Sequence, residues 1–263
     1  MVESVFSTRH RIHTVTAGVV IITGSSRGIG AATARLAAAR GYAVCVNYLR
    51  NRQAADAVVS DIERSGGRAI AVPADVASEA DVVRLFETSD ARLGTLTALV
   101  NNAGVLEQQM RVEHIDAARL SRIFAVNVTG CFLCAREAVR RMSTRHGGAG
   151  GAIVNVSSAA ARLGSPGEYV DYAASKGAIE TMTIGLASEV AGEGIRVNAV
   201  RAGIIDTEIH ASGGEPNRVE RIKGSIPMKR GGDPIEVARA IMWLLSDEAS
   251  YSTGTIVDVS GGR

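Results

Sequence analysis

Short apolar runs alternate along this chain with longer segments that have a helical pattern. The apolar runs show little internal alternation of apolar and polar positions, as expected of strands covered on both faces of a sheet. We predict seven strands, at residues 19–23, 43–47, 69–73, 98–101, 152–156, 196–200 and 255–259. We predict six helices, at residues 28–40, 52–65, 78–93, 116–142, 169–193 and 233–245. This order predicts a series of βαβ units and a parallel sheet.

One large domain fits this pattern, because no repeat, linker or shift in composition divides the chain. We therefore predict an α/β protein, a single-domain Rossmann fold with a doubly wound, mostly parallel seven-stranded sheet over residues 18–263. Residues 1–17 form a polar N-terminal arm to which the pattern assigns no role. The polar connection at 201–232 is long for a compact domain, and we interpret it as a substrate lid, with plain surface disorder as the alternative.

The composition limits the kinds of partner. Of the 263 residues, 46% are hydrophobic and 21% charged, and the net charge of +2 comes from dispersed basic residues. This distribution of charge does not predict a nucleic-acid-binding surface. No segment approaches ~20 uninterrupted apolar residues, which argues against a membrane span, and residues 1–16 lack the apolar run of a signal peptide. We expect a cytoplasmic protein with a small-molecule ligand.

The cysteines and the N-terminal histidines do not predict a metal site. Cys131 and Cys134 have the spacing of a redox or zinc motif, but no second pair of cysteines or nearby histidines completes a tetrahedral set. With Cys45 they form a sparse, odd set that suits a reducing compartment, and we interpret all three as structural thiols. His10 and His13 lie in the polar arm, where we expect them to be solvated.

A glycine-rich turn follows the first predicted strand and leads directly into a helix. Gly24 permits a tight turn, while Gly28 and Gly30 allow the backbone to approach a pyrophosphate. The helix N-terminus then offers free N–H groups to phosphates. The spacing is Gly-x3-Gly-x-Gly rather than the Gly-x-Gly-x2-Gly of the usual dinucleotide-binding motif. The glycines match that motif in the structural role they can play, and not in their exact spacing. Taken alone, the feature also fits an ordinary turn.

Tyr172 and Lys176 stand four residues apart in a predicted helix, so their side chains share one face. A cation beside a phenol favours the phenolate and lowers a pKa that is ordinarily near ~10. Such a phenol can exchange a proton with a carbonyl or an alcohol oxygen. Taken alone, the pair also fits two exposed side chains without a catalytic role. Together with the upstream glycine turn, it predicts a nicotinamide-dependent oxidoreductase.

These motifs together resemble the short-chain dehydrogenase/reductase family. The resemblance rests on the turn at 23–30, the segment 101–104, Asn127, Ser158 and the Tyr172/Lys176 pair, in the family's order along residues 18–262. Segments 46–48 and 225–232 extend it to members such as 3-oxoacyl-carrier-protein reductases and glucose-type dehydrogenases.

The resemblance implies a catalytic set of Asn127, Ser158, Tyr172 and Lys176. Tyr172 would exchange the proton, Ser158 would bind the substrate oxygen, and Lys176 would lower the phenol pKa and bind the nicotinamide ribose. Asn127 would kink its helix and hold a water that links Lys176 to solvent. From the residues alone, Ser157 is an alternative to Ser158. The loop at 164–167 would absorb one residue more than many relatives have between Ser158 and Tyr172.

The resemblance also implies the cofactor contacts. They are Gly24, Ser26, Arg27, Gly28, Ile29, Gly30, Asn47, Tyr48, Arg50, Asp75, Val76, Asn102, Ala103, Gly104, Tyr172, Lys176, Gly203, Ile205 and Thr207. Asp75 and Val76 would contact the adenine, and the segment 201–207 would touch the carboxamide. Ala202 stands where relatives have Pro, so we expect a looser loop there.

The end of the second strand predicts the choice of cofactor. An NAD enzyme places an acid there to bind the ribose 2′-hydroxyl, but this chain has Tyr48. Arg27 and Arg50 would bind a 2′-phosphate through charge-assisted hydrogen bonds, unless they are simply solvated. We predict NADP, with NAD the alternative.

Other functions remain open from the sequence. A catalytically idle dinucleotide sensor is the main alternative, although it has no need of Ser158, Tyr172 and Lys176. The chain is too short for the extra substrate domain of an extended-type epimerase. Apolar faces on helices 116–142 and 169–193 predict a homotetramer, by analogy with the family. The lid has few aromatic residues and no carboxylate clamp, so the substrate and the direction of reaction are not assigned.

Overall fold

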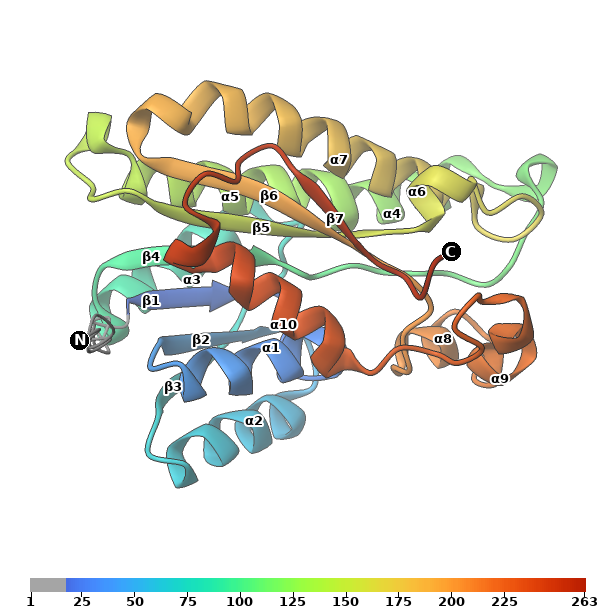
Figure 1. Ribbon diagram of the computed structural model, residues 1–263, viewed down its shortest axis with the longest axis horizontal. Helices are drawn as coiled ribbons and strands as arrows, with labels where there is room; N and C mark the ends of the chain where they lie inside the picture. The colour runs from blue at the N-terminus through green and yellow to red at the C-terminus, as the bar shows by residue number, and fades with distance from the viewer. Residues whose placement is uncertain (1–17) are drawn as a thin grey trace, which may run out of the picture.

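Seven parallel strands form a single sheet in the computed structural model, which describes residues 18–263 (Figure 1). The strands are β1 (Val19–Ile22), β2 (Ala43–Tyr48), β3 (Arg68–Pro73), β4 (Leu96–Asn101), β5 (Gly151–Ser158), β6 (Ile195–Ala202) and β7 (Ile256–Val259). Their order is β3-β2-β1-β4-β5-β6-β7, and every pairing is parallel. The predicted Rossmann fold is confirmed. The order reverses between β1 and β4, where ligands bind in folds of this type.

Helices cover both faces of the sheet (Figure 1). The longer ones are α1 (Gly28–Ala39), α2 (Arg52–Arg64), α3 (Glu79–Leu93), α4 (Ala117–Phe124), α5 (Gly130–Met142), α7 (Val170–Val190) and α10 (Pro234–Leu245). Side chains of α1, α2 and α10 build one core cluster with the sheet, and those of α3, α5 and α7 build the other. In β1, Val20 and Ile22 belong to the first cluster, and Val19 and Ile21 to the second. Burial of both faces explains the uninterrupted apolar runs.

Several predicted helix bounds shift by one residue because the first predicted residue is a cap. Ser78, Asp116 and Asp233 each accept a hydrogen bond from a backbone N–H of the first turn, and so stand just outside their helices. The predicted helix 169–193 is α7 followed by a 3₁₀ turn, Ala191–Glu193.

The predicted continuous helix 116–142 is wrong in one respect, because a π-helical turn at Ala125–Thr129 separates α4 from α5. Asn127 lies in this turn, and Asn is unfavourable inside a regular helix because its side chain competes for backbone groups. The π turn lies where the resemblance implies a kink.

The combined helix Ala117–Met142 is long and apolar enough to cross a membrane by length and composition alone. It also has the features of a core helix, since Cys134, Ala138 and Met142 pack against the sheet.

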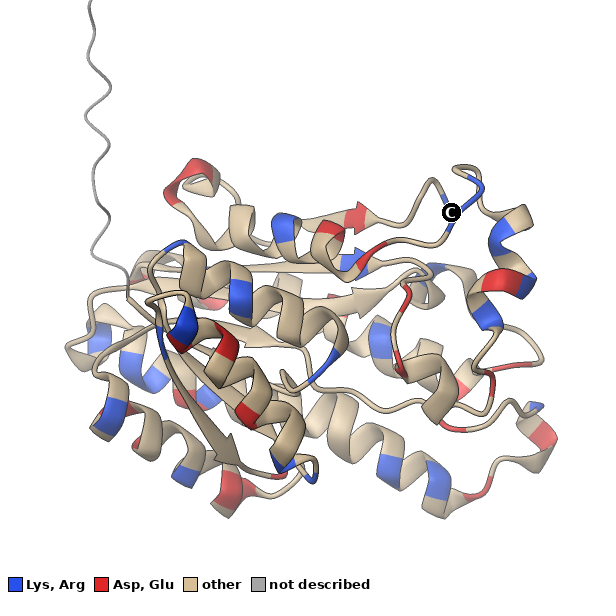
Figure 2. Ribbon diagram, turned by 90° about the horizontal axis from the view of Figure 1, so that it is seen from below, with Lys and Arg blue, Asp and Glu red and all other residues tan. Residues whose placement is uncertain are grey.

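Basic and acidic residues are mixed along the helices. Figure 2 shows no large region of the ribbon with charges of only one sign in that view.

The connection after β6 contains more structure than the predicted loop at 201–232. Strand β6 continues to Ala202, and two short helices follow, α8 (Ile209–Ser212) and α9 (Arg218–Ile222). A parallel bridge between Ile205 and Gly232 brings the two ends of the excursion together. We refer to residues 203–231 as the lid segment.

Candidate active site

Side chains from β2 and from the segment after β4 hold the glycine turn in place. Asn47 Oδ1 accepts from the Gly24 N–H at 3.0 Å, and Asn102 Nδ2 donates to the carbonyls of Thr23 and Gly24 at 2.9 and 3.0 Å. A Cβ atom at Gly30 would lie 2.5 Å from Asn102 Nδ2. Gly30 is therefore needed so that the Asn102 amide can pack against the turn.

The N-terminus of α1 has no cap from a side chain. Arg27 occupies the cap position without accepting a hydrogen bond, and the first turn contains no acid. In contrast, Asn51, Ser78 and Asp233 cap the helices α2, α3 and α10. Uncapped N–H groups and the helix dipole form an anion site, so this end of α1 fits a dinucleotide phosphate.

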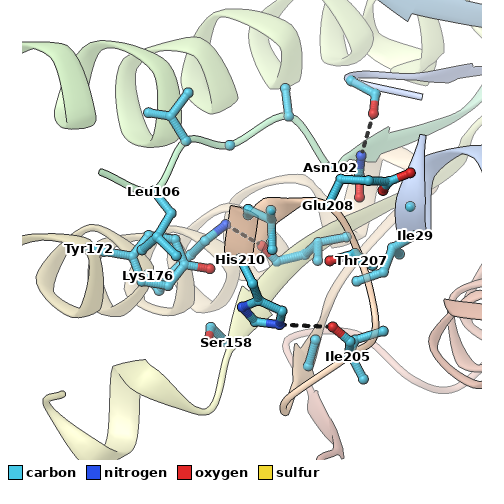
Figure 3. A pocket seen from close by; sticks show the side chains of 18 of the residues that line it. Ile29, Asn102, Leu106, Ser158, Tyr172, Lys176, Ile205, Thr207, Glu208 and His210 are labelled. Atoms are coloured by element: carbon cyan, nitrogen blue, oxygen red, sulfur yellow. Dashed lines mark hydrogen bonds between the residues drawn. The ribbon is translucent and has the colours of Figure 1, made fainter. Parts of the chain in front are cut away.

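A cavity of about 960 Å³ runs along the carboxyl ends of the strands. Of the residues that the resemblance implies, all but two line it; the exceptions are Gly30, which lies beneath the turn, and Asn127. Figure 3 shows Asn102 and Ile29 at one end of this cavity and Tyr172, Lys176 and Ser158 at the other. The glycine turn and the predicted catalytic residues therefore share one cavity.

Helix α7 carries both Tyr172 and Lys176 into this cavity, as their spacing predicted. Lys176 is buried, and its Nζ atom donates to the Val156 carbonyl at 2.8 Å. The same Nζ atom lies 5.6 Å from the centroid of the Tyr172 ring. The backbone of β5 thus fixes the ammonium beside the phenol ring.

The predicted lowering of the Tyr172 pKa by Lys176 is wrong for the protein without ligands. Burial raises the pKa of Tyr172, and hydrogen bonding to Ser158 offsets only part of this effect. Burial also lowers the pKa of Lys176 to about 8, because a low-dielectric site disfavours each charged form. Desolvation therefore decides the direction of both shifts.

The shifted Lys176 pKa predicts a pH-dependent stability. The folded protein releases this proton near pH 8 and the unfolded chain near pH 10.5, so the unfolded state binds more protons between these values. The contribution of Lys176 to the free energy of unfolding must then rise with pH, by up to about 3 kcal/mol over this interval. Urea unfolding of wild type and Lys176→Met at pH 7.5–10.5 measures this contribution. The free energy of unfolding of wild type should rise with pH relative to that of Lys176→Met. A difference between the two proteins that does not change with pH contradicts the prediction.

The two serines at the end of β5 have different surroundings. Ser157 is buried and its hydroxyl donates to Glu180 Oε1 at 2.8 Å, while Arg201 binds both oxygens of that carboxylate. Ser158 is partly exposed to the cavity, and its Oγ accepts from the Ala160 N–H at 3.2 Å. The geometry therefore favours Ser158 over Ser157 as the group that faces a substrate.

Asn127 connects the π turn to two other segments of the site. Its Oδ1 accepts from the Val105 N–H at 2.8 Å, and its Nδ2 donates to the Val105 carbonyl and to Ser175 Oγ, each at 3.1 Å. A small cavity of about 10 Å³ touches both Asn127 and Lys176, which is near the lower limit for one water. Asn127 thus positions the segment after β4 against α7.

A buried ion pair fixes the start of the catalytic helix. Arg119 Nε lies 2.5 Å from Asp171 Oδ2, and the two side chains are 4% and 0% exposed. Asp171 Oδ1 also accepts from the Tyr172 N–H at 2.9 Å, and Arg119 Nη1 donates to the Gln108 carbonyl at 2.7 Å. This pair joins α4, α7 and the segment between β4 and α4.

The residues expected to choose the cofactor are Tyr48 at the end of β2, Arg50 just after it and Arg27 in the glycine turn; one is buried and two are exposed. Tyr48 is 7% exposed and packs in the core beside α1 and α2, so only part of it borders the cavity. Arg27 and Arg50 are exposed and line the cavity, and in residues 18–263 neither lies within 4.0 Å of a carboxylate oxygen. Arg27 Nη2 donates to Ser212 Oγ of the lid segment at 3.2 Å.

Strand pairing holds the start of the lid at Ala202, and the expected looser loop stays a prediction. Ala202 is buried in β6, opposite Ser158 and Val259, and its carbonyl accepts from the Ala159 N–H at 2.8 Å. Strand pairing on both sides holds this backbone in place of a proline ring.

Several lining residues were not predicted from the sequence. They are Leu106, Leu163, Ser165, Pro166, Glu168, Tyr169, Ile204, Ile209, His210, Arg218 and Arg263, with others of the same segments. Tyr169 had a signal, since it precedes Tyr172 by three residues and so shares its side of α7. The lid residues were expected only as a segment, because the approach of each one depends on how the lid folds back over the strands.

The three cysteines are buried and free. Burial raises the pKa of Cys45 and of Cys131 to about 12, which keeps both thiols protonated and poorly nucleophilic. Within residues 18–263 no group of three metal-binding side chains was found. His10 and His13 lie outside the described residues.

The doubly wound sheet and the cavity at the carboxyl ends of its strands are those expected of a dinucleotide-binding protein. The sequence matches the family described as "Enoyl-(Acyl carrier protein) reductase" over residues 24–263. It is 59% identical to the uncharacterized oxidoreductase YgfF of Escherichia coli (strain K12), over 93% of this chain and 99% of that protein. It is 39% identical to a 3-oxoacyl-[acyl-carrier-protein] reductase of Synechocystis sp. (94% and 97% of the chains) and to glucose 1-dehydrogenase 2 of Bacillus subtilis (94% and 95%).

Among solved structures, a double mutant of a Serratia marcescens short-chain dehydrogenase/reductase matches with a TM-score of 0.87 at 33% identity. The match covers 95% of this chain and 99% of that one. The chain belongs to the short-chain dehydrogenase/reductase family, whose members use NAD or NADP, and it is an oxidoreductase.

Proposed function

We propose that this protein is an NADP(H)-dependent oxidoreductase that interconverts a carbonyl compound and an alcohol, with Tyr172 as its acid and base. The observation that carries the proposal is the convergence of Ser158, Tyr172 and Lys176 on the cavity that the glycine turn also lines. The uncapped end of α1 and the space left by the glycines fit a dinucleotide.

The proposed chemistry assigns one task to each side chain. A bound nicotinamide supplies or accepts the hydride. The Tyr172 hydroxyl gives its proton to the carbonyl oxygen during reduction and takes it back during oxidation. The Ser158 hydroxyl donates a hydrogen bond to the same oxygen and stabilises its negative charge. Lys176, when protonated, stabilises the phenolate and holds the nicotinamide ribose, and Asn127 positions the water that connects Lys176 to solvent.

The preference for NADP rests on Arg27 and Arg50. Both are exposed at the cofactor end of the cavity with no carboxylate within 4.0 Å among residues 18–263, so both are available to a 2′-phosphate. No acid stands at the end of β2 to bind the free ribose hydroxyls of NAD.

Replacing these arginines is expected to weaken NADPH binding selectively. A charge-assisted hydrogen bond contributes roughly 1.5–3 kcal/mol, so Arg50→Ala and Arg27→Ala should each reduce NADPH affinity tenfold or more and leave NADH affinity nearly unchanged. Fluorescence titration of both cofactors measures this effect. Arg52→Ala is the matched control, because Arg52 is exposed nearby but pairs with Asp56 and does not line the cavity. Equal affinity of wild type for the two cofactors contradicts the proposal.

A panel of ketones, sugars and acyl thioesters tests the activity itself, with NADPH absorbance as the readout. The alternative of a catalytically idle sensor predicts cofactor binding without turnover on any of them. No residue contact in the site favours that alternative.

We further propose that the lid segment covers the substrate. Four of its residues line the cavity beyond the ends of the strands, namely Ile204, Ile209, His210 and Arg218.

We expect a homotetramer, because α4, α5 and α7 expose large apolar side chains. Leu120, Phe124, Phe132 and Ile184 are between 37% and 52% exposed. Pairing of these helices between copies would remove that surface from water, and closed two-fold symmetry is the commonest arrangement. Sedimentation velocity at micromolar concentration tests this expectation, and a monomer contradicts it.

A further inference from the structure

The end of β5 that carries Ser158 is paired with a neighbouring strand on one side only. Strand β4 pairs with β5 as far as Asn155, whereas β6 continues opposite Ser157 and Ser158. In the part of the chain that the structure describes, no strand pairs with residues 156–158 on the β4 side, and these residues border the cavity. We call them the β5 overhang. Contacts from outside the sheet must hold this edge, because its backbone has no strand partner there.

Helix α7 supplies two such contacts from one of its faces. Lys176 and Glu180 stand four residues apart, so their side chains project from the same side of the helix. Lys176 Nζ donates to the Val156 carbonyl at 2.8 Å, and Ser157 Oγ donates to Glu180 Oε1 at 2.8 Å. The two residues before Ser158 are thus each bound to the helix that also carries the proposed acid.

The Glu180 carboxylate is itself held in place by Arg201. Arg201 Nε donates to Oε1 at 2.8 Å and Nη2 donates to Oε2 at 2.7 Å, while Nη1 binds both oxygens of Asp258. Ser157, Arg201 and Asp258 lie opposite one another on β5, β6 and β7. The side chains of Glu180 and Arg201 are only 15% and 13% exposed, so little water competes for these bonds.

The position of the Ser158 hydroxyl depends on the residue before it. A single peptide unit joins Ser157 to Ser158, and Ser158 Oγ accepts from the Ala160 N–H at 3.2 Å, just past the end of the strand. Strand β6 fixes one edge of this unit, and the bond from Ser157 to Glu180 fixes its other side. A shift of Ser157 therefore moves the Ser158 hydroxyl, and a misplacement of about 1 Å in an active site can lower a rate ~10²-fold.

We propose that Ser157 and Glu180 are positioning residues, which hold the Ser158 hydroxyl at the place where the substrate oxygen binds. This inference rests on the proposed function, in which Ser158 donates a hydrogen bond to that oxygen. Glu180 holds Ser157, and Ser157 fixes the overhang that carries Ser158. Neither residue acts by touching the substrate, since Ser157 is 2% exposed and Glu180 does not line the cavity.

Ser157→Ala is expected to reduce kcat about tenfold and to leave the dissociation constant of NADPH unchanged, because the substitution displaces only the neighbouring hydroxyl. Steady-state reduction of the best carbonyl compound of the panel and fluorescence titration of NADPH measure the two effects. A kcat equal to that of wild type overturns the proposal.

Ser143→Ala is the matched control. Ser143 is also buried, and its Oγ donates to a carboxylate, Glu193 Oε2, at 2.5 Å, but it does not line the cavity. Urea unfolding should show at least as large a loss of stability in Ser143→Ala as in Ser157→Ala, and only Ser157→Ala should lose turnover. Equal losses of kcat in the two variants would mean that any buried serine bond matters in this way, and would overturn the proposal.

A double-mutant cycle with Ser158 tests how the effect reaches the substrate. Ser158→Ala removes a donor to a developing oxyanion and should lower kcat about 10²-fold or more. If Ser157 acts through Ser158, Ser157→Ala/Ser158→Ala should have the kcat of Ser158→Ala alone, since no hydroxyl is left to misplace. Independent effects would lower kcat of the double variant by about a further tenfold. That result overturns the proposal, because Ser157 would then act on the fold or on another group.

Two substitutions separate the hydrogen bond of Glu180 from its charge. Glutamine keeps an oxygen that can accept from Ser157, while leucine has a similar volume and no acceptor. Both remove the negative charge that pairs with Arg201. Glu180→Gln should therefore keep most of the wild-type kcat, and Glu180→Leu should lower it as much as Ser157→Ala does. Equal losses in the two Glu180 variants would assign the effect to the charge and overturn the positioning role.

Amide hydrogen exchange separates failure of this inference from failure of the proposed function. If wild type reduces no carbonyl compound, the proposed function falls, and exchange alone decides whether Ser157 and Glu180 hold the end of β5. The probes are the N–H groups of Ala159 and Ala160, the two residues that follow the overhang, which are both hydrogen-bonded. Their exchange should be about tenfold faster in Ser157→Ala and Glu180→Leu, and unchanged in Ser143→Ala. Exchange as slow as in wild type in Ser157→Ala overturns the inference.

Discussion

Replacement of Tyr172 by Phe is expected to reduce kcat by about 10²–10⁴-fold while the affinity for NADPH stays within a factor of two or three. The substitution removes only the hydroxyl, and the ring that lies beside the Lys176 ammonium remains. Since the proposed role of this hydroxyl is proton transfer, ground-state binding of the cofactor should be preserved. Steady-state kinetics with fluorescence titration of NADPH measures the two effects separately.

Two further variants make this result specific. Tyr251→Phe removes a hydroxyl from a fully exposed tyrosine and should leave kcat unchanged. Lys176→Ala should impair both turnover and cofactor binding, because Lys176 is proposed to serve both. A Tyr172→Phe enzyme with a near-normal rate would assign the acid to another group.

Asp171→Asn is expected to lower the free energy of unfolding by about 3–5 kcal/mol, although it preserves the size and shape of the side chain. The substitution leaves the Arg119 guanidinium buried without its counter-charge, and Arg119 cannot become neutral. Chemical denaturation in urea measures the loss, and the double variant Arg119→Met/Asp171→Asn should recover part of it because no charge is then buried.

An exposed ion pair provides the comparison. Asp61 pairs with Arg35 and Arg64 on the surface of α1 and α2, where side chains are 35–72% exposed. Asp61→Asn should lower the free energy of unfolding far less than Asp171→Asn does, since solvent screens such pairs. Equal losses in the free energy of unfolding for Asp61→Asn and Asp171→Asn would mean that burial does not increase the contribution of the Arg119–Asp171 pair to stability.

The strands and the long helices could be predicted because burial leaves a direct pattern in the sequence. In β1, side chains on both faces are covered, and an uninterrupted apolar run follows from that arrangement. The break in helix 116–142 was indicated only by Asn127, and the pattern of apolar residues does not register it. The short helices α8 and α9 were missed, since they are stabilised by contacts with distant segments such as the Glu168–Arg218 ion pair.

The site was predictable where chemistry depends on spacing along one element. Tyr172 and Lys176 share a face of α7, and the glycines follow β1 directly. Other properties depend on tertiary environment. The pKa of Tyr172 is raised rather than lowered because burial acts more strongly than the hydrogen bond with Ser158, and the extent of burial cannot be derived from the i, i+4 spacing.

The hydrogen bonds from Asn47 and Asn102 to the glycine turn have a consequence for the thermodynamics of cofactor binding. They fix the backbone of the turn in the protein without ligands, at the place where the phosphates are proposed to lie. Ordering a flexible backbone residue costs roughly 1–2 kcal/mol in conformational entropy, and here that entropy is already lost on folding. Association with the dinucleotide should therefore be nearly free of loop-ordering entropy, and the affinity should depend on the stability of the β1, β2 and β4 strand ends that carry these side chains.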